Sequence, residues 1–137
     1  MKIVRKLFLL LLCSMLLSAF SSKDSSGCIQ RGWEMLGERS VNFKADKDEI
    51  MVTASEGRFS AVQIRVKRAP INMQRMVIHF GDGEEQTVEL KDNFRAGGES
   101  RIIDLEGKKR VIRKVSFWYD TKGFGDHKAI VQLWGRH

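Results

Sequence analysis

The residues best suited to metal or acid–base chemistry lie in the last fifth of the sequence. Asp120, Asp126 and His127 bracket the segment TKGFG. Their oxygens and imidazole could hold a divalent cation if the segment folds back on itself. A connection this short, with Gly123 and Gly125 inside it, is more often only a turn. A metal-dependent or hydrolase-like enzyme is therefore an alternative reading and not the preferred one.

Elsewhere the sequence has no spacing typical of a catalytic motif. His79 and His137 each lack a second histidine at metal-ligand spacing. Ser116 and Cys28 are candidate nucleophiles, but neither has a histidine close in sequence to activate it. Nucleophile-elbow, zinc-protease and phosphate-loop motifs are lacking. The sequence favours a function without catalysis, and it predicts no cofactor.

A basic loop is the first candidate binding surface. Lys108, Lys109 and Arg110 are consecutive in the sequence and could contact an anionic envelope polymer. The alternative is an ordinary solvated face that nearby glutamates balance. Residues 1–21 carry three positive charges and no negative ones, so without them the formal net charge of +7 falls to +4. That mild charge argues against nucleic acid as the partner.

The elements that must position these residues show a period of two. Apolar and polar residues alternate in short segments separated by Gly, Asp or Asn, which is typical of strands with one buried face. We predict an all-β antiparallel β-sandwich or jelly roll of about eight strands, with a small barrel as the alternative. Residues 33–39 are expected to form one helical turn at most. The expected strands are 40–44, 49–53, 59–68, 71–80, 84–90, 100–105, 109–120 and 128–134.

One hairpin can be placed in register from its turn residues. The turn is Gly81–Asp82–Gly83, and a three-residue loop with Gly83 in the left-handed region keeps apolar residues on one face. A strict two-residue turn would misplace that face. The loop predicts that Ile78 pairs with Gln86 and Met76 with Val88.

A second hairpin is expected between residues 111–120 and 128–134. Its apolar residues share one face if the two strands are paired directly. The expected pairs are Tyr119 with Ala129, Phe117 with Val131, and Val115 with Leu133.

This register predicts an apolar patch on the other face of the hairpin. Trp118 would lie opposite Ile130, and Lys114 would lie opposite Trp134, where a cation–π contact could form. Because tryptophan is large and usually mostly buried, residues 22–40 are expected to cover this patch. The functional alternative is a platform for a carbohydrate or a protein partner.

The N-terminal residues differ in kind from the rest of the chain. A basic start precedes an apolar run from Leu7 to Leu17, which is typical of a secretory signal and short for a membrane span. We therefore expect a signal peptide over 1–21, a polar leader over 22–32 and a single β-sandwich domain over 33–137. A retained anchor, or lipidation at Cys28, is a less favoured alternative. The mature chain is expected to be periplasmic or secreted, without a transmembrane span.

Five stretches of the chain carry a resemblance to known proteins: WEMLGERSVNFKADKDEI, GRFSAVQIRV, GGESRIIDLEG, IRKVSFWY and AIVQLWG. Together they resemble an uncharacterised family of small exported bacterial proteins. The resemblance spans nearly all of 33–135 and implies a signal peptide followed by one compact β-domain. The family has no assigned activity, so the resemblance implies no functional residues. A looser likeness in pattern is to galactose-binding-type jelly rolls.

The sequence thus favours an exported, non-catalytic module that binds an envelope or extracellular component. The component could be a glycan, an anionic polymer or a protein. The alternatives are the enzyme described above and a structural protein without a small-molecule ligand. The residues that we expect to bind are Lys108, Lys109, Arg110, Lys114, Trp118, Ile130 and Trp134.

Overall fold

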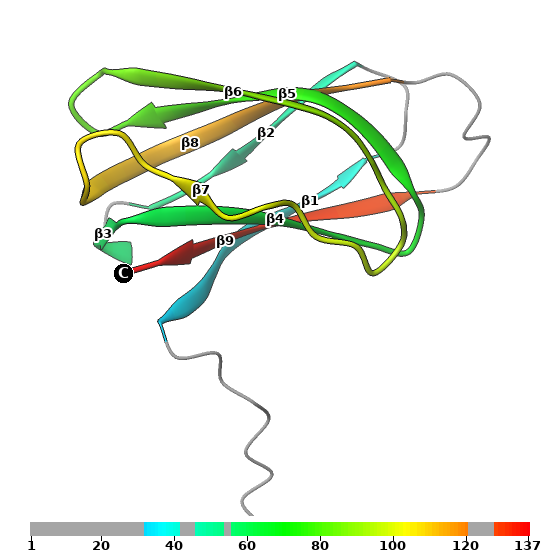
Figure 1. The fold of residues 1–137 in the computed structure, drawn as a ribbon, viewed down its shortest axis with the longest axis horizontal. Coiled ribbons are helices and arrows are strands. Elements are labelled where there is room, and N and C mark those ends of the chain that lie inside the picture. Colours follow the sequence, from blue (N-terminus) through cyan, green and yellow to red (C-terminus); the bar gives the residue numbers. More distant parts are fainter. Residues whose placement is uncertain (1–31, 42–45, 54–55, 121–127) are drawn as a thin grey trace, which may run out of the picture.

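The computed structural model describes residues 32–41, 46–53, 56–120 and 128–137, which form nine β-strands (Figure 1). Among these residues, no helix has the length and hydropathy that a membrane crossing requires. The strands are β1 (Trp33–Val41), β2 (Lys47–Met51), β3 (Arg58–Phe59), β4 (Ala61–Lys67), β5 (Ile71–Phe80), β6 (Glu85–Phe94), β7 (Ile103–Asp104), β8 (Arg110–Tyr119) and β9 (Ala129–Arg136).

The strands form two antiparallel sheets that pack face to face (Figure 1). One sheet has the order β1-β9-β4-β7, and the other has the order β2-β8-β5-β6 with β3 beside β8. Among the strands described, only β5 and β6 are both consecutive and paired, because the chain repeatedly passes from one sheet to the other. This is the arrangement of a jelly roll. The predicted all-β antiparallel sandwich is confirmed, with one short strand more than expected.

A single apolar core lies between the sheets. Val62, Ile64 and Val66 of β4 are completely buried, as their alternation predicts. Met76 and Ile78 of β5 are equally inaccessible. Burying a large apolar side chain stabilises a fold by about 1.5–3 kcal/mol. The core therefore holds the two sheets together, and their outer faces carry the candidate binding residues. Figure 1 shows the two layers, with β5, β6, β8 and β2 in one and β4, β9 and β1 in the other.

The β5–β6 hairpin has the predicted register. Met76 pairs with Val88, and Ile78 pairs with Gln86. Gly83 has a φ of 91°, a left-handed conformation that glycine adopts without strain. The turn residues and the alternation together therefore placed this hairpin correctly.

The second predicted hairpin is wrong, because β8 and β9 lie in different sheets. β8 pairs with β2 and β5, whereas β9 pairs with β1 and β4. Alternation shows which side of a strand faces the core. It does not distinguish neighbours in one sheet from strands that face each other across the core. Phe117 and Leu133 are both fully buried in the common core, but they belong to opposite layers.

The segment that we expected to be a helical turn, residues 33–39, forms most of β1 (Trp33–Val41). A bulge between Met35 and Gly37 interrupts its alternation, which hides the strand from a search for period two. Leu36 points into the core and is 7% exposed. A Cβ atom on Gly37 would lie 2.7 Å from Ile50 Cγ2, so β1 and β2 pack too closely at this point for a side chain.

Candidate functional site

All three tryptophans of the chain lie on outer sides of the sheets and are partly exposed. Trp33 and Trp134 belong to the four-stranded sheet, whereas Trp118 belongs to the other sheet. The predicted patch of Trp118, Ile130 and Trp134 is therefore not one surface. Ile130 and Trp134 do share the outer side of β9, and Trp118 lies on the opposite face of the molecule.

Hydrogen bonds hold the indole of Trp134 in place. Its Nε1–H donates to Gln132 Oε1 at 3.2 Å, and Gln132 Nε2 donates to Glu38 Oε2 at 3.1 Å. The guanidinium of Arg65 lies over the indole, 4.2 Å from the ring centroid, and Arg65 Nε donates to Gln63 Oε1 at 3.3 Å. Gln63 and Gln132 are both buried. The ring is thus oriented from two sides before any ligand arrives.

Two further apolar side chains lie beside Trp134. Met35 pairs with Trp134 across β1 and β9 and is 43% exposed. Trp33, two residues earlier on β1, has the guanidinium of Arg136 5.4 Å from its ring centroid. We name the outer side of β1, β9 and β4 around Trp33, Met35, Trp134 and Arg65 the tryptophan face.

Trp118 lies between two cations on the opposite sheet. Its neighbour Lys47 on β2 places Nζ 5.0 Å from the ring centroid, and Arg75 on β5 places its guanidinium at 4.2 Å. The two cations come from opposite sides, because β8 lies between β2 and β5. We name Lys47, Trp118 and Arg75 the Trp118 site.

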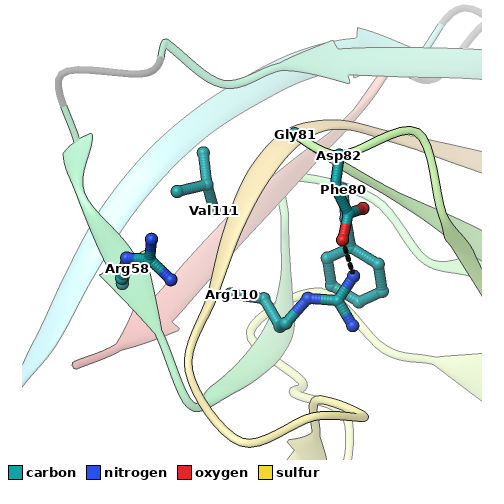
Figure 2. Close-up of a pocket in the computed structure, with 6 residues that line it drawn as sticks. All are labelled: Arg58, Phe80, Gly81, Asp82, Arg110 and Val111. Atoms are coloured by element: carbon teal, nitrogen blue, oxygen red, sulfur yellow. Dashed lines mark hydrogen bonds and ion pairs between the residues drawn. The ribbon is translucent and has the colours of Figure 1, made fainter.

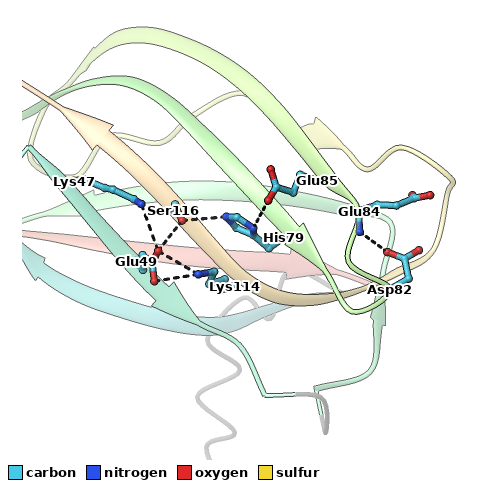
Figure 3. Close-up of polar contacts among 8 residues, drawn as sticks. All are labelled: Lys47, Glu49, His79, Asp82, Glu84, Glu85, Lys114 and Ser116. Carbon is cyan, nitrogen blue, oxygen red and sulfur yellow. Dashed lines mark hydrogen bonds and ion pairs between the residues drawn. The ribbon is translucent and has the colours of Figure 1, made fainter.

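A polar network adjoins the Trp118 site on the same outer face (Figure 3). Lys114 Nζ lies 3.3 Å from Glu49 Oε1, and this hydrogen bond holds the pKa of Glu49 below its ordinary value. Lys114 therefore does not lie over Trp134 as predicted. Ser116 Oγ donates to Glu49 Oε1 at 3.1 Å and also lies 3.2 Å from His79 Nε2. His79 Nδ1 in turn lies 3.1 Å from Glu85 Oε1.

The order Glu85, His79, Ser116 is that of a serine-hydrolase triad, but the arrangement does not support its chemistry. The Ser116 hydroxyl has one proton, and donating it to Glu49 leaves none for His79 to accept. Ser116 is also only 1% exposed, so a substrate carbonyl cannot reach its oxygen. The sequence does not reveal this contact, because it joins residues on β5 and β8, whose pairing follows only from the strand order.

Arg110 of the basic loop lines an open hollow at one end of the sandwich (Figure 2). The hollow has a volume of about 440 Å³. Arg110 stacks on Phe80 at 4.0 Å and donates to Asp82 at 2.8 Å and Glu84 at 2.7 Å. Arg110, predicted to bind an anion, is thus already engaged within the fold. The side chains that line the hollow are Arg58, Phe80, Gly81, Asp82, Arg110 and Val111.

Lys108 and Lys109 are exposed in the loop before β8. Asp126 and His127 lie outside the residues that the structure describes, so a metal site with Asp120 stays a prediction. Within the described ranges, no group of three or more His, Cys, Asp or Glu side chains could hold a metal ion.

Comparison with known families decides where the chain belongs. Residues 7–135 match the family described as Domain of unknown function (DUF2541). The chain belongs to this family. The predicted membership of an uncharacterised family is thereby confirmed over nearly the whole sequence. No curated protein matches the chain.

Two solved structures illustrate what this member of the family is similar to. AlgX from Pseudomonas aeruginosa has a TM-score of 0.50 and 11% identity, over 76% of this chain and 26% of AlgX. The chain thus spans about a quarter of the length of AlgX. A mutant of the family 29 carbohydrate-binding module CBM29-2, complexed with cellulohexaose, has a TM-score of 0.39 and 13% identity, over 77% of this chain and 80% of that one. At 11% identity, the likeness to AlgX is one of fold alone.

Proposed function

We propose that this chain is an exported, non-catalytic β-sandwich module that binds a glycan on its tryptophan face. The observation that carries the proposal is the fixed, partly exposed indole of Trp134 among hydrogen-bonding side chains. The basic start and apolar run of residues 1–21 support the export.

The tryptophan face has the two kinds of group that sugars need. A pyranose ring has apolar C–H groups that pack on an aromatic side chain, and hydroxyls that require hydrogen-bond partners. Trp33, Met35 and Trp134 offer the apolar contact. Arg65 and the carboxylate of Glu38 border it with a donor and an acceptor. Because the network around Gln132 already fixes Trp134, binding a sugar would cost little side-chain entropy.

A protein partner fits this face less well. A stable protein interface has an apolar centre and usually buries about 800 Å² on each side. Charged residues border the apolar residues here, because Glu38 and Lys67 are exposed on the same outer side of the sheet. Among the described residues of the face, only Met35 is a large apolar side chain that is prominently exposed.

Calorimetric titration of the purified chain with neutral hexasaccharides tests the proposal. The panel would contain gluco-, xylo- and manno-configured oligomers. We expect at least one to bind, and we expect Trp134→Ala to weaken that binding about tenfold or more, as loss of a packed aromatic contact does. Lys91→Ala, an exposed change on the other sheet, is the matched control. Failure of every oligomer to bind the folded chain, or equal affinity in Trp134→Ala, would overturn the proposal.

A further inference from the structure

We propose that the Trp118 site is a second binding site, on the opposite face from the tryptophan face, and that it takes an acidic polysaccharide. Cations border Trp118 on both neighbouring strands. Adjacent strands are about 4.8 Å apart, so Lys47 and Arg75 branch from backbones separated by about 10 Å. Their charged groups lie 5.0 and 4.2 Å from the ring centroid of Trp118, so a ligand with two or more negative charges can contact both cations beside the indole.

The local charges favour such a ligand. Glu49 lies 3.7 Å from Lys47 and 3.3 Å from Lys114, so one carboxylate serves two lysines. Among the described residues, Arg75 has no carboxylate within ion-pair distance, although Glu89 lies opposite it on β6. Lys47, Lys114 and Arg75 outnumber the carboxylates of Glu49 and Glu89 beside them, so this part of the face keeps a positive charge.

The backbone is irregular at the same place. β5 contains one extra residue relative to β8 at Gln74, so that Arg75, and not Gln74, lies beside Trp118. Without this bulge, the alternation from buried Met73 would turn Arg75 toward the core. On β6, Lys91 has a φ of 43°, which a non-glycine residue rarely adopts and which is strained. Strain of this kind concentrates at functional sites, and here it accompanies the outward position of Arg75.

The geometry also distinguishes a polysaccharide from other anions. A single phosphate or sulfate would reach one cation and leave the indole unused. Trp118 is partly exposed between the cations, and its indole adds an apolar contact that suits the C–H groups of a sugar ring. Nucleic acid would require a broader positive surface, and the glutamates of β6 limit this one at its edge.

Binding of the full chain to polygalacturonate, dextran sulfate, dextran and a single-stranded oligonucleotide tests the inference. We expect an acidic polysaccharide to bind, with carboxylated and sulfated polymers showing which anion is preferred, and dextran not to bind at this site. Arg75→Gln and Lys47→Gln should each weaken the binding about tenfold, as loss of a charge-assisted contact does. Arg95→Gln and Lys67→Gln are the matched controls, since each removes one exposed cation elsewhere, and they should have little effect.

The outcomes separate this inference from the proposed function. Loss of acidic-polymer binding in Arg75→Gln, with neutral-glycan binding intact, supports two sites. Suppose that acidic-polymer binding depends on Arg75 but the chain binds no neutral oligomer. This result would support the Trp118 site and reject glycan binding at the tryptophan face. If Arg95→Gln and Lys67→Gln weakened acidic-polymer binding as much as Arg75→Gln does, the attraction would be diffuse and the inference would be overturned. Absence of acidic-polymer binding, or tighter binding of the oligonucleotide, would do the same.

Discussion

Trp134 owes its orientation to the side chains that surround it. Gln132 is 7% exposed, accepts from the indole and donates to Glu38. Arg65 covers part of the ring. The sequence placed Trp134 and Trp118 on outward sides correctly, but it could not supply these partners. Gln132, Glu38 and Arg65 lie on three different strands, and their meeting depends on a strand order that alternation does not encode.

We expect Gln132→Ala to weaken glycan binding as well as the fold. The change removes both hydrogen bonds of the side chain, and a typical hydrogen bond contributes about 1 kcal/mol to the free energy of unfolding. Because the indole of Trp134 would then be free to rotate, neutral-glycan affinity should fall by more than the small loss of stability explains. Urea denaturation and calorimetry measure the two effects. Unchanged glycan affinity in Gln132→Ala would show that the network has no role in positioning.

Gly135 on β9 permits close packing that no other residue allows. A Cβ at this position would lie 2.7 Å from Phe59 Cδ1 and 2.8 Å from Leu36 Cδ1. We expect Gly135→Ala to lower the free energy of unfolding by about 1–3 kcal/mol, the usual cost of overpacking a core. Gly83→Asn is a useful control, because nothing lies within 4 Å of that position and Asn tolerates a left-handed backbone. Similar stability of both variants in urea would contradict the packing.

The strands differ in how much of their placement the sequence determines. The GDG turn fixes β5 and β6, since its glycines allow only a few loop conformations and only one keeps Met76 opposite Val88. No such turn chemistry joins β8 to β9, and both strands satisfy the apolar alternation equally well in one sheet or in two. β1 was missed because its bulge at Met35 shifts the alternation by one residue.

The strained backbone of β6 gives a prediction at the level of this element. Glycine adopts the left-handed region freely, whereas other residues pay about 1–2 kcal/mol for it. Lys91→Gly should therefore leave the free energy of unfolding unchanged or slightly raised. Asp92→Gly, one residue further along the same strand, should lower the free energy of unfolding by about 1 kcal/mol, because glycine loses more backbone entropy on folding. Equal destabilisation of the two variants in chemical denaturation would show that Lys91 is not strained.

At the scale of the whole molecule, the sandwich carries different side chains on its two outer faces. The four-stranded sheet presents the tryptophan face, and the other sheet presents the Trp118 site. The fold class could be predicted because alternation with frequent turn residues has few other solutions. The separation of the tryptophans onto two faces could not, because it follows from chain crossings between the sheets.

The two ends of the described chain are joined by a titratable pair. His137 Nε2 lies 2.8 Å from Glu34 Oε2, and this hydrogen bond raises the pKa of His137 above its ordinary value of 6.5. A raised pKa means that the pair stabilises the fold fully below pH 6.5 and loses this effect as pH rises through the folded pKa. The gain is below about 1 kcal/mol because both side chains are half exposed.

We expect the melting temperature of the wild-type chain to fall slightly as pH rises above 6.5. In Glu34→Gln, which lacks the ion pair, this fall should be smaller. Glu38→Gln, which changes a nearby carboxylate on the same strand, should keep the wild-type pH dependence. Thermal melts at several pH values measure the difference. Parallel curves for wild type and Glu34→Gln would show that the pair contributes nothing.

If the tryptophan face binds a glycan, the three indole N–H signals of the chain in a nitrogen-15 NMR spectrum should report the contact. Titration with a neutral hexasaccharide should shift the signals of Trp134 and Trp33 and leave that of Trp118 in place. Each signal can be assigned with a Trp→Phe variant. A neutral glycan that shifts only Trp118, or one that binds and shifts none of the three, would contradict the account.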